Sequence, residues 1–283
     1  YIRLTWTPPA VQPVLTTPTA TSITATSATL GATVTAGEPL DERGTVWGTS
    51  ANPTGNALAE GGTTNSAYSH ARTGLPAQTR VFYRGYANNP SYPGEYSPDG
   101  SFWTEPSSPA SNVTFSGVTS TGMTINWTRG TGGAGGGVLV LVKAASAVDT
   151  DPVDGTYSTY VDNTAFGSGT ELGTGNFVVY KGTGSTVAVT GLSPVTTYHV
   201  AVYEFAGQAD TSGDDQGTNY TTAATSSQVT DAGAPTLSLP TATTITATTA
   251  TLGATVDADG GAALIERGTV WGTSPSPVGK EVA

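Results

Sequence analysis

Apolar and polar residues alternate along most of this chain with the period of two that is typical of β-strands. Val81, Tyr83 and Gly85 alternate with Phe82, Arg84 and Tyr86, so one strand with two different faces is expected there. No stretch shows helical periodicity with caps at both ends. The strands predicted by this pattern lie at 22–36, 42–49, 66–73, 79–88, 97–104, 111–117, 122–129, 137–146, 176–181, 185–191, 196–207 and near 219–230.

An internal repeat organises these strands. Residues 18–34 and 240–256 differ only by Ser22 in place of Thr244 and Ser27 in place of Thr249. The stretch ERGTVWGTS occurs at 42–50 and again at 266–274. Two segments this similar predict two copies of one domain type.

The repeat divides the chain into four parts. We expect an N-terminal strand or linker at 1–12, a domain of the first type at 13–106, a domain of a second type at 107–232, and an incomplete copy of the first type at 233–283. The incomplete copy carries too few strands to cover its apolar faces. The chain begins at Tyr1 with neither a Met nor a signal peptide, which is expected of a mature or excised segment.

The N-terminal residues carry the pattern of a donated strand. Ile2, Leu4 and Trp6 alternate with polar residues, and the run from Trp6 to Pro9 resembles the run from Trp103 to Pro106, where the first domain closes. We therefore expect residues 1–9 to insert beside 233–283 of a neighbouring subunit, head to tail. The alternative is a polypeptide that continues past Ala283 and completes the domain itself. On the acceptor side, the residues expected in the interface are Leu252, Val256, Val270 and Trp271.

The segment 191–205 carries a motif known from one family. Leu192-x-Pro194-x-Thr196-x-Tyr198 resembles the corner before the sixth strand of fibronectin type III domains, and Trp127 resembles the core Trp of their second strand. The resemblance implies tandem Ig-like antiparallel β-sandwiches of an all-β chain, with a spacer, adhesive or structural role. It places Tyr198 at the tyrosine corner with Leu192 and Pro194, and it carries no catalytic residue. In the first domain, Val81 stands at the corner position.

Charge and composition exclude several classes of function. The chain has 10 Lys and Arg against 21 Asp and Glu, which argues against binding to nucleic acid or to an anionic membrane surface. It has no Cys, so disulfides and thiolate metal sites are excluded. The sequence has no apolar run long enough to insert in a membrane. A surface kept wet by Thr, Ser, Asn and Gly indicates a secreted, cell-surface protein.

The candidate chemistry is sparse, and no active site, metal site or cofactor is expected. His70 and His199 are predicted within strands rather than in a catalytic triad. Asp149, Asp151 and Asp154 superficially resemble a Ca²⁺ loop but lack its closing Glu. The aromatic residues of the first domain would contact glycans if exposed, although a core role is favoured. The sequons at Asn112 and Asn219 are candidate glycosylation sites.

Together these features predict a non-catalytic protomer of an extracellular bacterial filament or surface array. The alternative is a spacer or adhesive repeat region of a larger secreted protein or enzyme.

Overall fold

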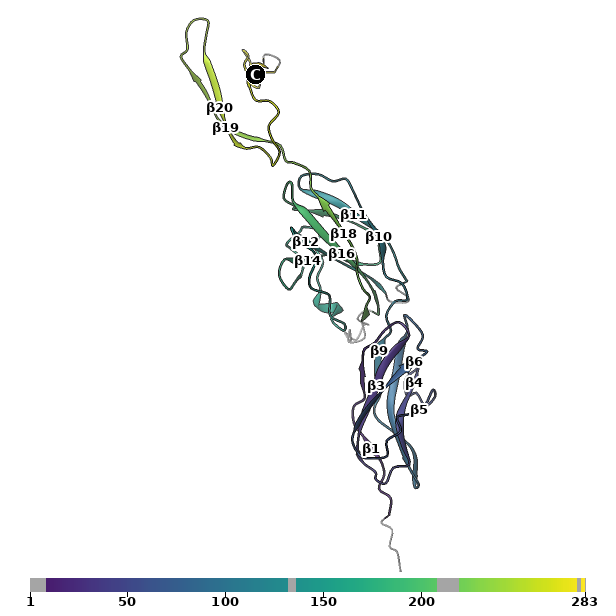
Figure 1. The fold of residues 1–283 in the computed structure, drawn as a ribbon. Helices are drawn as coiled ribbons and strands as arrows, with labels where there is room; N and C mark the ends of the chain where they lie inside the picture. Colours follow the sequence, from purple (N-terminus) through teal and green to yellow (C-terminus); the bar gives the residue numbers. More distant parts are fainter. Residues whose placement is uncertain (1–8, 132–135, 208–218, 279–280, 283) are drawn as a thin grey trace, which may run out of the picture.

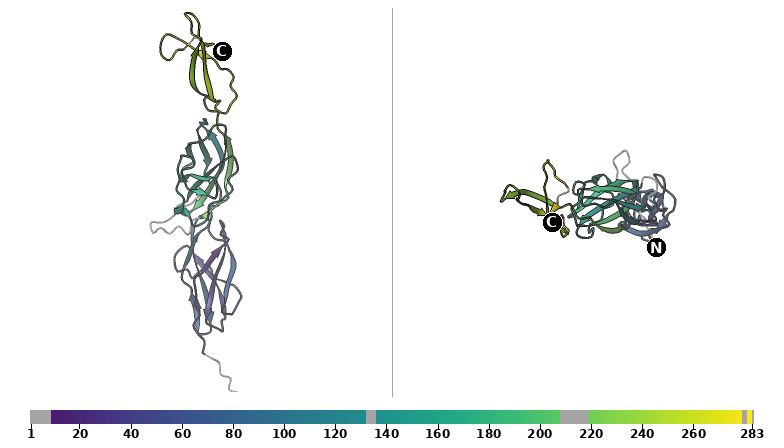
Figure 2. Two further views of the ribbon diagram at one scale, coloured as in Figure 1. Left: turned by 90° about the vertical axis from the view of Figure 1, so that its left-hand side faces the viewer. Right: turned by 90° about the horizontal axis from the view of Figure 1, so that it is seen from above.

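In a computed structural model, the chain forms a rod of three parts that follow one another end to end (Figure 1). The structure describes residues 9–131, 136–207, 219–278 and 281–282. The first and second parts are β-sandwiches, and the third part contains two separate strand pairs (Figure 2). The predicted all-β fold of antiparallel sheets is therefore confirmed.

The first sandwich packs two antiparallel sheets face to face. One sheet contains β1 (Val14–Leu15), β2 (Thr19–Thr21), β3 (Ser27–Ala36) and β6 (Ala67–Thr73). The other contains β4 (Glu42–Gly48), β5 (Leu58–Ala59), β7 (Arg80–Asn89), β8 (Tyr92–Tyr96) and β9 (Gly100–Trp103). On β7 the inward residues Val81 and Tyr83 are buried, as the alternation predicts.

The segment expected as one strand at 22–36 begins instead with a turn, and its strand starts at Ser27 and pairs with the preceding β2 as a hairpin. The chain turns between β2 and β3, where Thr24 Oγ1 accepts the backbone N–H groups of Thr26 and Ser27. A threonine hydroxyl that bonds its neighbouring backbone offers the chain an alternative to a continuous ladder. The alternation of apolar and polar residues does not predict this turn, because the repeated Thr and Ser residues suit both strands and turns.

The second sandwich has the same two-sheet plan. Its smaller sheet is formed by β10 (Ser111–Ser116), β11 (Gly122–Thr128) and β15 (Thr186–Thr190). Its larger sheet is formed by β12 (Gly137–Ala144), β13 (Glu171–Leu172), β14 (Asn176–Gly182), β16 (Thr197–Ala206), β17 (Asn219–Tyr220) and β18 (Ala224–Val229). Three strands facing a larger sheet is the fibronectin type III-like arrangement of a β-sandwich.

The long loop after β12 has a packing role that its polar composition does not suggest. Tyr160 and Leu172 from this loop region bury Leu139, Leu141 and Tyr203 on the outer face of the larger sheet. A short 3₁₀-helix, η1 (Tyr157–Thr159), lies within it. Because both of its faces are covered, β12 is a continuous apolar run rather than an alternating one.

The two sandwiches meet at Trp103, the last residue of β9. A Cβ added to Gly207 would overlap the Trp103 ring, so the ring packs directly on the glycine backbone. Gly207 also has a φ of +71°, which glycine adopts without steric cost. The amide of Asn219 donates a hydrogen bond of 3.1 Å to the carbonyl of Trp103. These contacts fix the end of the first sandwich on the second.

The third part repeats the first part in sequence and in register. Strands β19 (Thr236–Thr243) and β20 (Thr251–Ala258) form a hairpin in which Leu237 pairs with Val256, as Leu15 pairs with Val34. Strands β21 (Thr269–Val270) and β22 (Glu281–Val282) correspond to β4 and β5. Through residue 282, the described part of this copy has no counterpart of β6, β7 or β9.

We expect residues 107–232 to fold as an isolated fragment, because both sheets and the apolar cluster between them lie within that range. Far-UV circular dichroism should show β-structure, and denaturant should unfold the fragment in one cooperative transition. A spectrum of unfolded chain would contradict the boundaries.

A candidate assembly interface

The inner face of the third part is exposed where the same residues are buried in the first part. Leu237 is 65% exposed, whereas its counterpart Leu15 is 8% exposed. Leu264 is 37% exposed, whereas Leu40 is 5% exposed. A contiguous apolar surface of this kind is typical of an interaction site.

A groove of about 550 Å³ runs between the two strand pairs of the third part. Its apolar lining includes Leu237, Ala254, Val256 and Leu264. In the first sandwich, the counterparts of these four residues form one buried cluster with Tyr68 of β6 and Ala87 of β7. The groove is therefore the volume that β6 and β7 fill in the first copy.

The first sandwich shows how this volume is filled. The hydroxyl of Tyr68 donates a hydrogen bond of 2.5 Å to the carbonyl of Gly44, and the Arg43 guanidinium lies 5.0 Å from the centre of the ring. Arg43 is in turn held by Glu60 at 2.9 Å, and this contact lowers the pKa of Glu60. The counterparts of Gly44 and Arg43 are Gly268 and Arg267, and both line the groove.

The acceptor residues expected from the sequence do not all lie in this groove. Val256 lines it, and Leu252 is half-buried on the same strand. The counterpart of Trp271, Trp47, packs at the other end of the first core. Val46, the counterpart of Val270, is opposite Arg84 in the ladder, on the face of β4 that is turned away from Tyr68. Val270 is therefore placed outside the inner face, because successive residues of a strand point to opposite sides.

Leu237, Leu264 and Arg267 were missed by the sequence analysis. Their signal was present in the repeat, since each aligns with a residue that the first sandwich must bury. For Arg267, finding it required knowledge of which face of β4 points inward.

The donor residues Ile2, Leu4 and Trp6 lie outside the described residues. The strand they were compared with, however, is fully described. β9 pairs with β7. Phe102 in β9 and Thr104 just after it are buried, whereas Trp103 faces the second sandwich. Among the described residues of the third part, a strand in the β9 position has no neighbour, and matching Trp6 to Trp103 would turn Trp6 away from the core. Where residues 1–8 pair therefore stays a prediction.

Tyr198 lies at the corner before β16. Its hydroxyl accepts a hydrogen bond of 2.9 Å from the backbone N–H of Ser193. Leu192 is buried beside it, whereas Pro194 is exposed. In the first sandwich, Val81 is buried in the core at the equivalent position. The hydroxyl therefore ties the corner of the second sandwich by a contact that Val81 cannot make.

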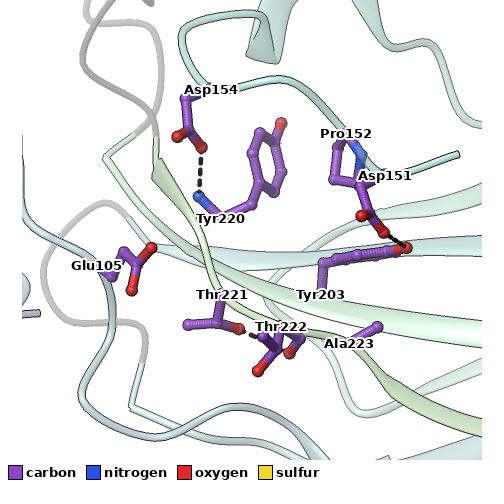
Figure 3. A pocket seen from close by; sticks show the side chains of 9 residues that line it. All are labelled: Glu105, Asp151, Pro152, Asp154, Tyr203, Tyr220, Thr221, Thr222 and Ala223. Atoms are coloured by element: carbon purple, nitrogen blue, oxygen red, sulfur yellow. Dashed lines mark hydrogen bonds between the residues drawn. The ribbon is translucent and has the colours of Figure 1, made fainter. Parts of the chain in front are cut away.

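A small acidic pocket of about 310 Å³ lies where the first sandwich leads into the second (Figure 3). Asp151 accepts a 2.7 Å bond from the Tyr203 hydroxyl, and Asp154 accepts a 2.9 Å bond from the Tyr220 backbone N–H. Glu105, which follows β9, completes the acidic lining. Burial raises the pKa of Glu105, and the nearby Asp154 carboxylate raises it further. Burial also raises the pKa of Asp154.

The three Asp residues that resembled a Ca²⁺ loop are engaged separately. Asp149 bonds Lys143 at 2.6 Å, away from the contacts of Asp151 and Asp154. Within the described ranges, no group of three or more His, Cys, Asp or Glu side chains is placed to hold a metal ion. Asp151 and Asp154 each bond to a tyrosine of the second sandwich, whereas Asp149 pairs with Lys143 at the surface.

The two histidines lie within strands, and His70 takes part in a structural cluster. The ring Nε2 of His70 lies 2.7 Å from Thr45 Oγ1, and Arg72 donates to the same oxygen at 2.6 Å. Burial, together with the Arg72 charge, lowers the pKa of His70. His199 lies mid-strand on β16, between β12 and β18.

The two sequons differ in accessibility. Asn112 is exposed on β10. Asn219 is 1% exposed, and its amide nitrogen is bonded to the carbonyl of Trp103, so it cannot accept a glycan in the folded chain. The expectation for Asn219 was wrong, because the sequence did not show that this residue lies at the junction of two sandwiches.

Among the described residues, no helix is long and apolar enough to cross a membrane.

One family model matches part of this chain. The family model of the purple acid phosphatase N-terminal domain matches residues 109–229, which are less than half of the chain. No curated protein matches the chain in sequence. Similar solved structures include the FN1–FN3 domains of chicken CNTN1, at 15% identity and a TM-score of 0.38 over 81% of this chain and 70% of that one.

Two further structures give similar values. A segment of two fibronectin type III domains from chicken tenascin has 14% identity and a TM-score of 0.36 over 76% of this chain and 99% of that one. Domains from titin have 14% identity and a TM-score of 0.34 over 74% of this chain and 60% of that one. Scores of this size carry no information on function.

Replacing Tyr198 by Phe should lower the free energy of unfolding of the second sandwich by about 1–2 kcal/mol, since the Ser193 N–H loses its acceptor. Denaturant unfolding measures this, and the transition of the first sandwich is the internal control. An unmoved midpoint for the second sandwich would show that the corner bond contributes nothing.

The acidic pocket should make stability depend on pH in a defined direction. A carboxyl whose folded pKa is raised contributes stability at low pH, and this contribution is lost as the pH rises through the folded pKa. Glu105→Gln should therefore raise the thermal midpoint at about pH 7, and the gain should disappear below the ordinary Glu value of 4.5. Asp154→Asn should behave in the same way. A gain that is equal at every pH would contradict the assignment.

Proposed function

We propose that this chain is a non-catalytic structural protomer that assembles head to tail into an extracellular filament or surface array. The observation that carries the proposal is the exposed inner face of the third part. Each Leu or Val side chain moved from water into a core stabilises the folded state by about 1.5–3 kcal/mol. A partner that covers this face would therefore gain a substantial driving force.

The shape of the molecule supports open-ended assembly. The acceptor groove lies in the third part, at one end of the rod, and the first sandwich, which residues 1–8 precede in the chain, forms the other end (Figure 1). One molecule cannot bring these two ends together, because two sandwiches separate them. A heterologous contact of this kind does not close on itself, and it propagates as a fibre.

The contacts at the two junctions between the three parts suit a stiff filament subunit. Trp103 packs on Gly207, and Val195 of the second sandwich packs on Gly261 of the third part, where an added Cβ would lie 2.7 Å from the valine side chain. Close contacts at both joints restrict rotation between the parts. Stiff subunits preserve the alignment of successive contacts along a filament.

The second candidate is a spacer or adhesive region of a larger secreted protein, with an enzyme among the candidates. The match of residues 109–229 to a family model supports it, since by its description that model is the N-terminal domain of purple acid phosphatase. In this reading the third part is completed by its own chain, and glycans are candidate ligands. Electron microscopy of purified protein separates the two: regular filaments support the first, and monodisperse particles the second.

Deleting residues 1–8, or replacing Ile2, Leu4 and Trp6 together by Asp, should abolish assembly, because charged side chains cannot be buried in the groove without partners. Sedimentation and negative-stain electron microscopy measure the outcome. The matched control replaces Arg3 and Thr5 by Asp, which keeps the apolar side chains. Filaments of unchanged length after the triple substitution would rule out donation of this strand.

A further inference from the structure

We propose that residues 1–8 of a second copy add antiparallel to the free edge of β20, in the place that β6 occupies in the first sandwich. This inference rests on the proposed function and assigns the edge, the direction and the register of the contact. It replaces the β9-like position that the sequence suggested.

The length of the available edges selects β20. β20 contains eight residues, Thr251–Ala258, and its only described neighbour in a sheet is β19. β21 contains two residues and already pairs with β22 on one side. In the first sandwich the equivalent edge of β3 binds the seven residues of β6. A donor of seven or eight residues matches the β20 edge and not that of β21.

The connection to the second sandwich selects the direction. β20 ends beside Gly260, which is bonded to Gly233, and it begins at the hairpin tip that points away from the second sandwich (Figure 1). An antiparallel donor starts near this joint and finishes at the tip, so that the body of its own molecule continues the rod. A parallel donor would direct that body into the second sandwich.

The inward residues of β20 and the two prolines select the register. Leu252, Ala254 and Val256 are the counterparts of Leu30, Ala32 and Val34, all buried in the first copy. Placing Leu4 opposite Ala254, where Ala32 faces Tyr68, puts Ile2 opposite Val256 and Trp6 opposite Leu252.

In this register, Pro8 falls opposite Ala250, one residue before β20 begins. A proline lacks the N–H that a ladder requires, so the donor ends where the ladder ends. Moving the donor by two residues, so that Trp6 faces Ala254, would place Pro8 opposite Leu252, inside the ladder.

The same register gives the indole of Trp6 a hydrogen-bond acceptor. Trp6 takes the place of His70, whose Nε2 lies 2.7 Å from Thr45 Oγ1. The counterpart of Thr45 is Thr269, which lines the groove. An indole N–H that enters a core needs such a partner.

Engineered disulfides test the register directly, because the chain has no cysteine of its own. Directly opposite residues in an antiparallel pair have Cβ atoms about 4.5–5.5 Å apart, which oxidation can bridge with little movement. Arg3→Cys in one protein and Thr255→Cys in another form an outward pair that leaves the apolar contact intact. After mixing and oxidation, a covalent mixed dimer should appear on a non-reducing gel.

The control pair is Thr7→Cys with Thr255→Cys, four residues out of register, which should give no mixed dimer. The inward pair Leu4→Cys with Ala254→Cys should give one and serves as an independent second measurement. Filaments that form without either matched crosslink would overturn this inference while leaving the proposed function standing. Chains that do not associate at all would overturn both.

Discussion

A β-sheet face built from Leu, Val and Ala has to be covered, and this requirement governs each part of the molecule. In the first sandwich, the inner residues of β3 and β4 are covered by β6, β7 and β9. In the second, even the outer face of the larger sheet is covered, by the loop that follows β12. Through residue 282, the described residues of the third part present the same apolar face as the first without counterparts of β6, β7 or β9, and the groove lies on that face.

The contacts in the first sandwich therefore indicate which properties a strand that covers the third part must have. A covering strand must supply apolar volume opposite Ala254, accommodate the Arg267 guanidinium, and satisfy the edge of β20 with backbone hydrogen bonds. Backbone pairing gives such an interface affinity, and alternate side chains give it specificity. An unpaired strand edge left in water is otherwise a site for uncontrolled association. These requirements explain why a strand, rather than a flat surface, is the natural occupant.

Much of the fold was predictable from the sequence, because the two-residue periodicity of a strand depends only on neighbouring residues. β4, β6, β7, β11 and β16 lie within one or two residues of their predicted positions. The turn at Thr24 was missed because Thr and Ser serve strands and turns equally. The short strands β5, β8 and β13 were missed because two to five residues carry too little pattern.

The candidate site was harder to predict, since it depends on which strands face each other across a core. Alternation identifies two faces of a strand but not which one is inward, and this is why Val270 was expected in the interface and Arg267 was not. The burial of Asn219 and the position of Trp103 arise at a junction between sandwiches, which local pattern does not report. The repeat contained the missing information, but only the arrangement of the first copy made it readable.

The central claim is that another chain covers β20, and amide hydrogen exchange of assembled and dissociated protein tests it most directly. The claim predicts that N–H groups of Thr251–Ala258 that exchange rapidly in the dissociated chain become strongly protected on assembly, to the level of the corresponding amides of β3. The amides of β11, inside the second sandwich, should exchange equally in both states. Rapid exchange along the β20 edge in fully assembled material would contradict the claim.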